Sequence, residues 1–352
     1  MRRMKIAMAA FLLAAGILGC AAEETAGEAM GIEVSADKAP SPSSQALLWS
    51  DMRPSHSMDL LYATQFSIDF YDGGYAAISV ADGSRYLVVP EGGAVPEGLP
   101  GNMTVIQKPL TNIYLVATSA MDLFRSLDGI GQVTLSGTDA SGWYIDEARE
   151  ALLRGDMCYA GKYNAPDYER ILEKSCDLAV ESTMIYHTPE VKEQLTRLGI
   201  PVFVERSSYE SHPLGRMEWL KLYGVLLDKE ETAQACFDEQ IEKLLQVEDQ
   251  ESTGKTVAFF YISSNGYVNV RKSGDYVAKM IGLAGGRYVP DQPDNGNALS
   301  TMNMQMEAFY AAARDADYLI YNSTIDGELK SLDELLAKSG VLADFKAVKA
   351  GN

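Results

Sequence analysis

The chain of 352 residues is poor in the side chains that bind metals or form disulfides. It contains four cysteines and three histidines. Beyond Cys20, the cysteines Cys158, Cys176 and Cys236 follow no zinc-binding spacing, and their odd number argues against a disulfide framework. Cys176 precedes an apolar, strand-like run, so we expect it to be a small buried hydrophobe.

Positive charge and long apolar runs are also scarce. The chain contains 30 lysines and arginines and 49 aspartates and glutamates, which gives a net charge of −19. An acidic chain without a basic run is a poor binder of nucleic acid or of an anionic membrane surface. No stretch approaches the ~20 apolar residues of a membrane-spanning helix. We therefore expect neither nucleic-acid binding nor a membrane span.

The N-terminus carries an export pattern. Arg2, Arg3 and Lys5 precede the uncharged apolar run Ile6 to Leu18, which is too short to span a bilayer. Gly19-Cys20 follows, and it resembles the lipobox of bacterial lipoproteins. The resemblance implies that residues 1–20 form a lipoprotein signal, that the Cys20 thiol carries diacylglycerol, and that the protein is lipid-anchored at the extracytoplasmic face of the cell membrane. A cleaved secretory peptide or an uncleaved anchor is the alternative.

The next segments read as a tether and a small sheet. Residues 21–55 are small, polar and unpatterned, which predicts a disordered tether. Alternating apolar residues in 66–70, 75–80 and 86–89, separated by glycine-containing turns, predict a three-stranded antiparallel meander.

Strands and helices then alternate, which predicts a parallel sheet with helices on both faces. We assign residues 56–215 to an N-terminal α/β lobe, 216–250 to connecting helices and 251–352 to a C-terminal α/β lobe. Apolar residues at helical spacing from Asp228 to Val247 predict a rod of roughly 30 Å. The predicted fold is therefore α/β, with two Rossmann-like lobes joined by one long helix.

Three segments resemble the substrate-binding lipoproteins of ABC importers, in the iron-siderophore, haem and vitamin B12 class. Asn164 to Leu172, followed by Cys176 to Val180, resembles an "N-x-E-x-I … x-D-L-V" signature of that family. Ser208 to Arg216 resembles its run into the inter-lobe helices. Met304 to Phe309, followed by Asp315 to Ile320, resembles the second-lobe counterpart of the first segment.

The resemblance covers roughly residues 60 to 352 and implies the class III periplasmic-binding-protein fold. Members usually continue beyond a point equivalent to Asn352 with a strand and a closing helix, so a C-terminal element is expected to be missing. The implied function is binding without catalysis: a monomer, without a cofactor, captures an iron chelate (siderophore- or haem-like) or a cobalamin-type ligand. It delivers this ligand to an ABC permease dimer with its ATPase.

The same resemblance implies which side chains take part. Aromatic and cationic residues line the ligand site in the family, and guanidinium groups suit anionic ligand oxygens because they offer planar, paired donors. Ligands of parallel α/β sheets bind beyond the carboxyl ends of the strands. The candidates after predicted strands are Tyr186, Arg206 and Tyr209 in the first lobe, and Tyr267 and Arg271 in the second. Glu169 and Glu307 match the family's permease-docking glutamates.

Two other classes of function stay open. An importer protein for bare zinc or manganese would use about three histidines and a carboxylate, for which His56, His187 and His212 are the candidates. An exported enzyme for a small molecule is the second alternative. We find no Ser-His-Asp spacing, nucleophile elbow or paired-carboxylate motif that supports it.

Overall fold

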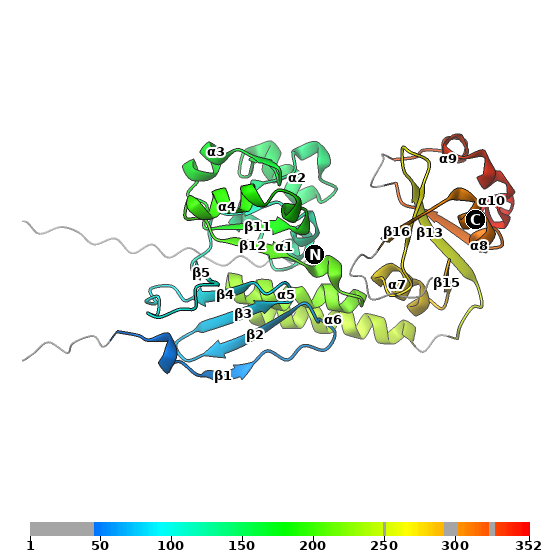
Figure 1. The fold of residues 1–352 in the computed structure, drawn as a ribbon. Helices are drawn as coiled ribbons and strands as arrows, with labels where there is room; N and C mark the ends of the chain where they lie inside the picture. The colour runs from blue at the N-terminus through cyan, green and yellow to red at the C-terminus, as the bar shows by residue number, and fades with distance from the viewer. Residues whose placement is uncertain (1–45, 249–250, 292–300, 324–327) are drawn as a thin grey trace, which may run out of the picture. The chain divides into compact units, whose positions relative to one another are not determined.

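The computed structural model describes residues 46–248, 251–291, 301–323 and 328–352 (Figure 1). The predicted signal peptide, the lipobox Cys20 and most of the predicted tether lie outside the described residues. None of the helices in the described part of the chain is long and apolar enough to cross a membrane.

A five-stranded sheet precedes the parallel one. Its strands lie in the order β1-β2-β3-β4-β5, antiparallel up to β4 and parallel between β4 and β5. Strands β2, β3 and β4 form the predicted meander. The bounds are β1 Pro54–Ser57, β2 Phe66–Tyr71, β3 Tyr75–Val80, β4 Arg85–Val89 and β5 Met103–Gln107.

The ordered part begins earlier than the sequence indicated. A short 3₁₀ helix, η1 (Trp49–Asp51), and strand β1 fall inside the segment 21–55 that we predicted to be a tether. All four residues of β1 are exposed, so the strand has no apolar alternation for a sequence pattern to detect. Its pairing with β2 and the stacking of His56 on Phe70, with ring centroids 4.6 Å apart, hold it in place.

The second sheet of this lobe is entirely parallel, with strand order β12-β11-β6-β7-β8. Its helices are short and follow the predicted alternation. The strands are β6 Ile113–Leu115, β7 Val133–Ser136, β8 Cys158–Tyr159, β11 Leu178–Ser182 and β12 Val202–Glu205. The helices are α1 Met121–Ser126, α2 Asp146–Arg154, α3 Tyr168–Glu173 and α4 Pro189–Arg197, and a small hairpin joins β9 (Gly161–Lys162) to β10 (Ala165–Pro166).

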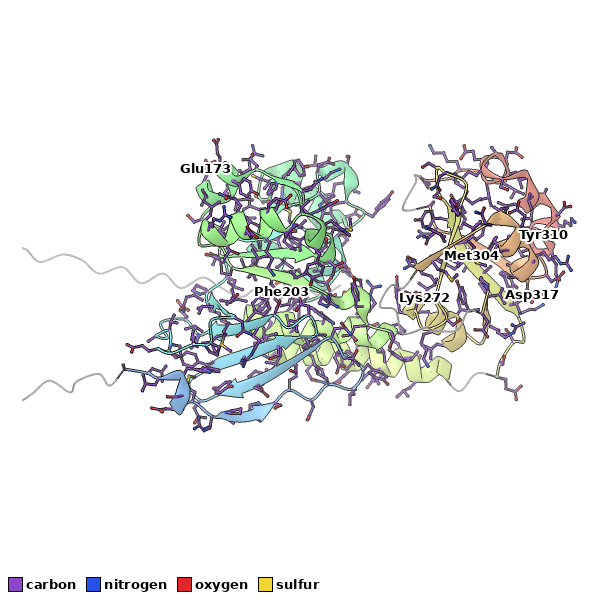
Figure 2. All side chains as sticks on the ribbon, in the orientation of Figure 1. Glu173, Phe203, Lys272, Met304, Tyr310 and Asp317 are labelled. Carbon is purple, nitrogen blue, oxygen red and sulfur yellow. The ribbon has the colours of Figure 1, made fainter. Side chains whose placement is uncertain are left out.

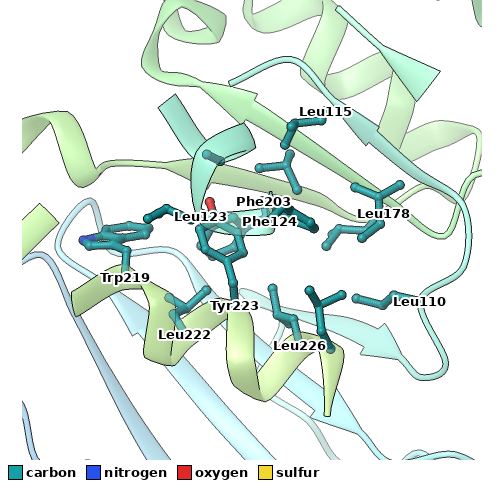
Figure 3. Close-up of a cluster of buried hydrophobic side chains, with 14 of the residues drawn as sticks. Leu110, Leu115, Leu123, Phe124, Leu178, Phe203, Trp219, Leu222, Tyr223 and Leu226 are labelled. Carbon is teal, nitrogen blue, oxygen red and sulfur yellow. The ribbon is translucent and has the colours of Figure 1, made fainter. Parts of the chain in front are cut away.

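One apolar core joins the two sheets of this lobe to helix α5 (Pro213–Leu227). Trp219 and Tyr223 of α5 are fully buried and pack around Phe203 of β12, which lies 6.2 Å from Trp219 and 6.5 Å from Tyr223 between ring centroids (Figure 3). Figure 2 shows Phe203 within the same lobe. A helix buried on nearly every side has no single apolar stripe, and α5 accordingly carries almost no periodic signal.

Two helices follow the parallel sheet of this lobe, and the second matches the predicted rod. Helix α5 ends where Asp228 adopts a left-handed conformation with φ of 55°, and α6 (Glu230–Glu248) begins two residues later. The backbone N–H of Lys229 donates to the carbonyl oxygen of Gly224, which closes the end of α5. Helix α6 occupies the range that the helical periodicity indicated, and it packs against α5 through Ala233 and Phe237, both fully buried.

The C-terminal lobe has its own mixed sheet. Strand β13 pairs in parallel with β15 and β17 and antiparallel with β14, which in turn pairs antiparallel with β16. Phe260, Phe309 and Phe345 form its aromatic core, with ring centroids 4.7 and 5.5 Å apart. The strands are β13 Thr256–Ile262, β14 Val268–Arg271, β15 Arg287–Val289, β16 Thr301–Met304 and β17 Tyr318–Tyr321; the helices are α7 Tyr276–Leu283, α8 Met306–Ala313, α9 Leu332–Lys338 and α10 Lys346–Ala350.

The same hydrogen-bond arrangement occurs in both lobes. Asp177 precedes β11, and its Oδ2 accepts hydrogen bonds of 2.8 Å from the backbone N–H groups of Thr111 and Asn112, just before β6. Asp317 precedes β17, and its Oδ2 accepts 2.8 Å from the backbone N–H of Thr256, the first residue of β13. Each aspartate thus fixes the start of the adjacent parallel strand. This agrees with the expectation that the second-lobe segment is a counterpart of the first.

Candidate functional site

Three of the predicted ligand-binding residues meet at one edge of the parallel sheet in the N-terminal lobe. Tyr186 lies in the 3₁₀ helix η5 (Thr183–His187), which follows β11. Arg206 comes directly after β12, and Tyr209 ends the next 3₁₀ helix, η6 (Ser207–Tyr209). Because β11 and β12 are parallel neighbours, their carboxyl ends place these side chains together.

The Arg206 guanidinium is the centre of this group. Its Nη1 donates to Tyr186 Oη at 3.3 Å, and its Nη2 donates to Gln65 Oε1 at 3.4 Å. Its Cζ lies 4.3 Å from the centroid of the Tyr209 ring, a cation–π geometry. Arg206 Nε is buried without a hydrogen-bond partner, and none of the ion pairs between described residues involves Arg206. The guanidinium is therefore oriented on three sides while no carboxylate contacts it directly.

A carboxylate approaches from the other sheet. Asp82, in the turn between β3 and β4, accepts a hydrogen bond of 2.5 Å from the Tyr186 hydroxyl. Burial alone would raise the pKa of Asp82, but the hydrogen bonds from Tyr186 and Ser84 and the charge of Arg206 hold it below its usual value. Burial and the bond to Asp82 raise the pKa of Tyr186 to about 12. At neutral pH, the phenol thus donates to an ionised Asp82 and accepts from Arg206.

The loop that carries Gln65 is fixed by two glutamates next to and within α5. Glu218, fully buried, accepts hydrogen bonds of 2.8 to 3.1 Å from the backbone N–H groups of residues 61 to 63. Glu210 accepts from the backbone N–H groups of Thr64 and Gln65, at 2.8 and 3.0 Å, and from Trp219 Nε1 at 3.0 Å. These bonds leave few unsatisfied donors in the loop, so Gln65 has a defined place beside Arg206.

Sequence reasoning missed Asp82 and Gln65. Asp82 has the ordinary signature of a turn residue, and Gln65 lies more than a hundred residues from Arg206 along the chain, so no local pattern connects them. Two exposed apolar side chains that follow strands of the same sheet were also missed. Tyr144, which follows β7, is 92% exposed, and Met184, which follows β11, is 45% exposed. Large apolar side chains outside the core, after predicted strands, would have been the signal for both.

The two candidates of the second lobe do not meet. Tyr267 precedes β14 and Arg271 is its last residue, so the length of a four-residue strand, ~13 Å, separates them. Arg271 Nη1 lies 3.7 Å from Asp275 Oδ2, and its Cζ lies 5.7 Å from the Phe259 ring centroid. Tyr267, 38% exposed, lies with β14's first residues beside the carboxyl end of β13.

The three histidines lie in separate places. His56 is in β1, His187 ends η5, and His212 caps α5, where its ring stacks on Tyr62 with centroids 4.5 Å apart. Across the residues that the structure describes, no group of three or more His, Cys, Asp or Glu side chains could hold a metal ion. This arrangement gives no support to a bare zinc or manganese site in that part of the chain.

The predicted docking glutamates are exposed at helix starts. Glu169 lies in the first turn of α3 and Glu307 in the first turn of α8. Neither carboxylate has a hydrogen bond or ion pair with another described residue. Both are therefore available to a partner.

Comparisons with known proteins agree on the architecture. No family model matches the chain. A periplasmic haem-binding protein of Vibrio cholerae aligns over 69% of this chain and 88% of its own, with a TM-score of 0.56 and 18% identity. A periplasmic binding protein of Veillonella parvula aligns over 73% and 87%, with a TM-score of 0.57 and 14% identity. The chain has the class III periplasmic-binding-protein fold. The predicted fold class is confirmed.

Two uncharacterized lipoproteins are similar to this chain in sequence. An uncharacterized lipoprotein of Methanocaldococcus jannaschii is 25% identical over 88% of this chain and 77% of its own length. A second uncharacterized lipoprotein of the same organism is 23% identical over 82% and 74%. The similarity of this chain therefore extends over most of the length of both relatives.

Proposed function

We propose that this protein is an extracytoplasmic substrate-binding lipoprotein that captures a metal chelate and delivers it to an ABC importer. The observation that carries the proposal is the Arg206 group at the carboxyl edge of a periplasmic-binding-protein sheet. Solved structures with this fold include proteins described as binding haem, and one from Staphylococcus epidermidis described as possibly iron-binding. The likeness to proteins described as binding solutes favours binding over catalysis.

The ligand in this proposal is an iron chelate or a cobalamin-type molecule. Arg206 offers guanidinium donors to an oxygen of the ligand, and Tyr186 and Tyr209 offer aromatic surface beside it. Arg271 and Tyr267 are the candidates from the second lobe. The partners are a permease dimer with its ATPase, and the protein acts as a monomer without a cofactor.

Ligand capture is tested on protein purified from its own host. Native mass spectrometry and the visible spectrum should reveal a bound chelate, and Arg206→Ala should weaken its binding by roughly thirty-fold, because truncating a partner of a buried polar contact costs ~2 kcal/mol or more. Arg149→Ala is the matched control, since Arg149 is exposed on α2 and forms an ion pair with Asp146 of the same helix. Equal affinities in the two variants would remove Arg206 from the site, and tight binding of zinc alone would favour a bare-metal importer protein.

The lipid anchor is tested separately. The Gly19-Cys20 pair motivates it. The intact mass of the membrane fraction should contain a diacylglyceryl adduct, and Cys20→Ala should release the protein from the membrane because one apolar anchor is lost. Fractionation of Cys20→Ala with the membrane, as for the wild type, would contradict the anchor.

A further inference from the structure

Arg206 is linked to a carboxylate of the protein through one hydroxyl group. The Tyr186 hydroxyl oxygen lies 3.3 Å from Arg206 Nη1 and 2.5 Å from Asp82 Oδ2, and it links the two charged groups. The phenol has one proton, and the carboxylate can only accept, so the proton points to Asp82 and the phenol lone pairs face Arg206. The short hydrogen bond from Tyr186 to Asp82 is charge-assisted, and bonds of this kind are strong and hold both partners in a defined geometry.

An additional acidic group lies nearby. Glu205, the last residue of β12, is 2% exposed and accepts from Ser119 Oγ at 2.8 Å and from the Ser207 backbone N–H at 2.7 Å. Arg206 is therefore flanked by Glu205 in sequence and by Asp82 in space. A chain with a net charge of −19 adds to the negative potential. An anionic ligand that approaches Arg206 meets the exposed carboxylate of Asp82, whereas the buried Glu205 adds only to the negative potential. Like-charge contacts are a common means of rejecting a wrong partner.

We infer that Asp82 is a specificity-determining residue of the first-lobe site. It makes the site prefer a neutral metal chelate that carries hydrogen-bond donors, and it disfavours a polyanionic chelate. This inference rests on the proposed function and names its ligand class. The exposed Met184, in the same 3₁₀ helix as Tyr186, fits such a ligand, because it offers apolar surface to a molecule without net charge.

The experiment compares two iron complexes of similar size and different charge. Binding of a neutral ferric tris-hydroxamate and of a trianionic ferric tris-catecholate to the full chain in detergent is measured by calorimetry. The wild type should prefer the neutral complex. Asp82→Asn should shift the ratio of the two affinities toward the anionic complex by on the order of tenfold, since one like charge is removed.

Asp72→Asn is the matched control. Asp72 lies in the β2–β3 turn, at the other end of strand β3, and its substitution changes the net charge equally without touching Arg206. An equal ratio in Asp82→Asn and Asp72→Asn, with both complexes bound, would overturn the role of Asp82 and leave the proposed function standing. A wild type that binds neither complex would overturn the proposed function, and this inference with it.

Discussion

At the scale of single residues, Glu181 departs most from ordinary protein chemistry. It lies in β11, its side chain is fully buried, and neither carboxylate oxygen has a hydrogen-bond partner. Burial raises its pKa to about 8. The carboxyl group is therefore neutral at pH 7 in the folded protein and ionised in the unfolded chain, where its pKa is about 4.3. An unpaired buried carboxyl at this position destabilises the fold as the pH rises.

The sign of this effect gives a prediction. The pKa of Glu181 is higher in the folded state than in the unfolded chain. Its contribution to stability is therefore fully present below about pH 4.3 and is lost as the pH rises through 8. From pH 5 to pH 8, Glu181 should lower the free energy of unfolding by about 3 kcal/mol. Glu181→Gln, which cannot ionise, should remove that slope in urea unfolding measured across this range. Glu173→Gln, exposed on α3 (Figure 2), is the control and should keep it. Identical slopes in wild type and Glu181→Gln would show that the carboxyl finds a partner.

At the scale of elements, the contact between α5 and α6 depends on a missing side chain. A Cβ at Gly224 would lie 2.7 Å from Ala233 Cβ and 3.2 Å from the Lys229 carbonyl oxygen. Both neighbours belong to α6 or to the turn before it, so they cannot rotate away. Glycine here permits the close approach that closes the α5–α6 turn.

Gly224→Ala should therefore destabilise the protein although alanine is the better helix former. Overpacking costs about 1–3 kcal/mol, and the gain in helix propensity is about 1 kcal/mol, so we expect a net loss of up to about 2 kcal/mol. The control is Gly282→Ala in α7, where no atom lies within 4 Å of the added Cβ and the propensity gain should stand alone. The midpoints of thermal unfolding distinguish the two. A Gly224→Ala variant as stable as Gly282→Ala would mean that α6 shifts at little cost.

The same helices show how far the sequence could predict the structure. Helix α6 was predicted because one of its faces is apolar, whereas α5 gave no periodic signal because it is buried almost all round. Tyr186, Arg206 and Tyr209 were predicted because parallel strands bring their carboxyl ends together. Asp82 and Gln65 were not, since they lie in a turn and a loop of the other sheet; Gln65 contacts Arg206, and Asp82 is linked to it through Tyr186. What the sequence could not supply was the packing between sheets that only tertiary structure determines.

At the scale of the whole molecule, the proposed function requires recognition by a permease as well as binding of a ligand. Glu169 and Glu307 occupy equivalent places in the two lobes: each lies in the first turn of the helix that leads into the strand begun by Asp177 or Asp317. A carboxylate in the first turn of a helix also interacts favourably with the helix dipole, by ~0.3–1 kcal/mol. The structural role and the docking role therefore make different predictions.

If the two glutamates dock the permease, the double variant Glu169→Ala/Glu307→Ala should keep its ligand affinity and lose about tenfold or more in affinity for the permease. The loss should be greatest at low salt, because exposed charges are screened as ionic strength rises. Ligand affinity and vesicle transport are measured on the same preparations. Glu173→Ala/Asp333→Ala is the control. It removes two exposed carboxylates from helices α3 and α9 and leaves the two docking glutamates in place. If transport by the docking double variant equals that of the control, both residues serve only their own helices.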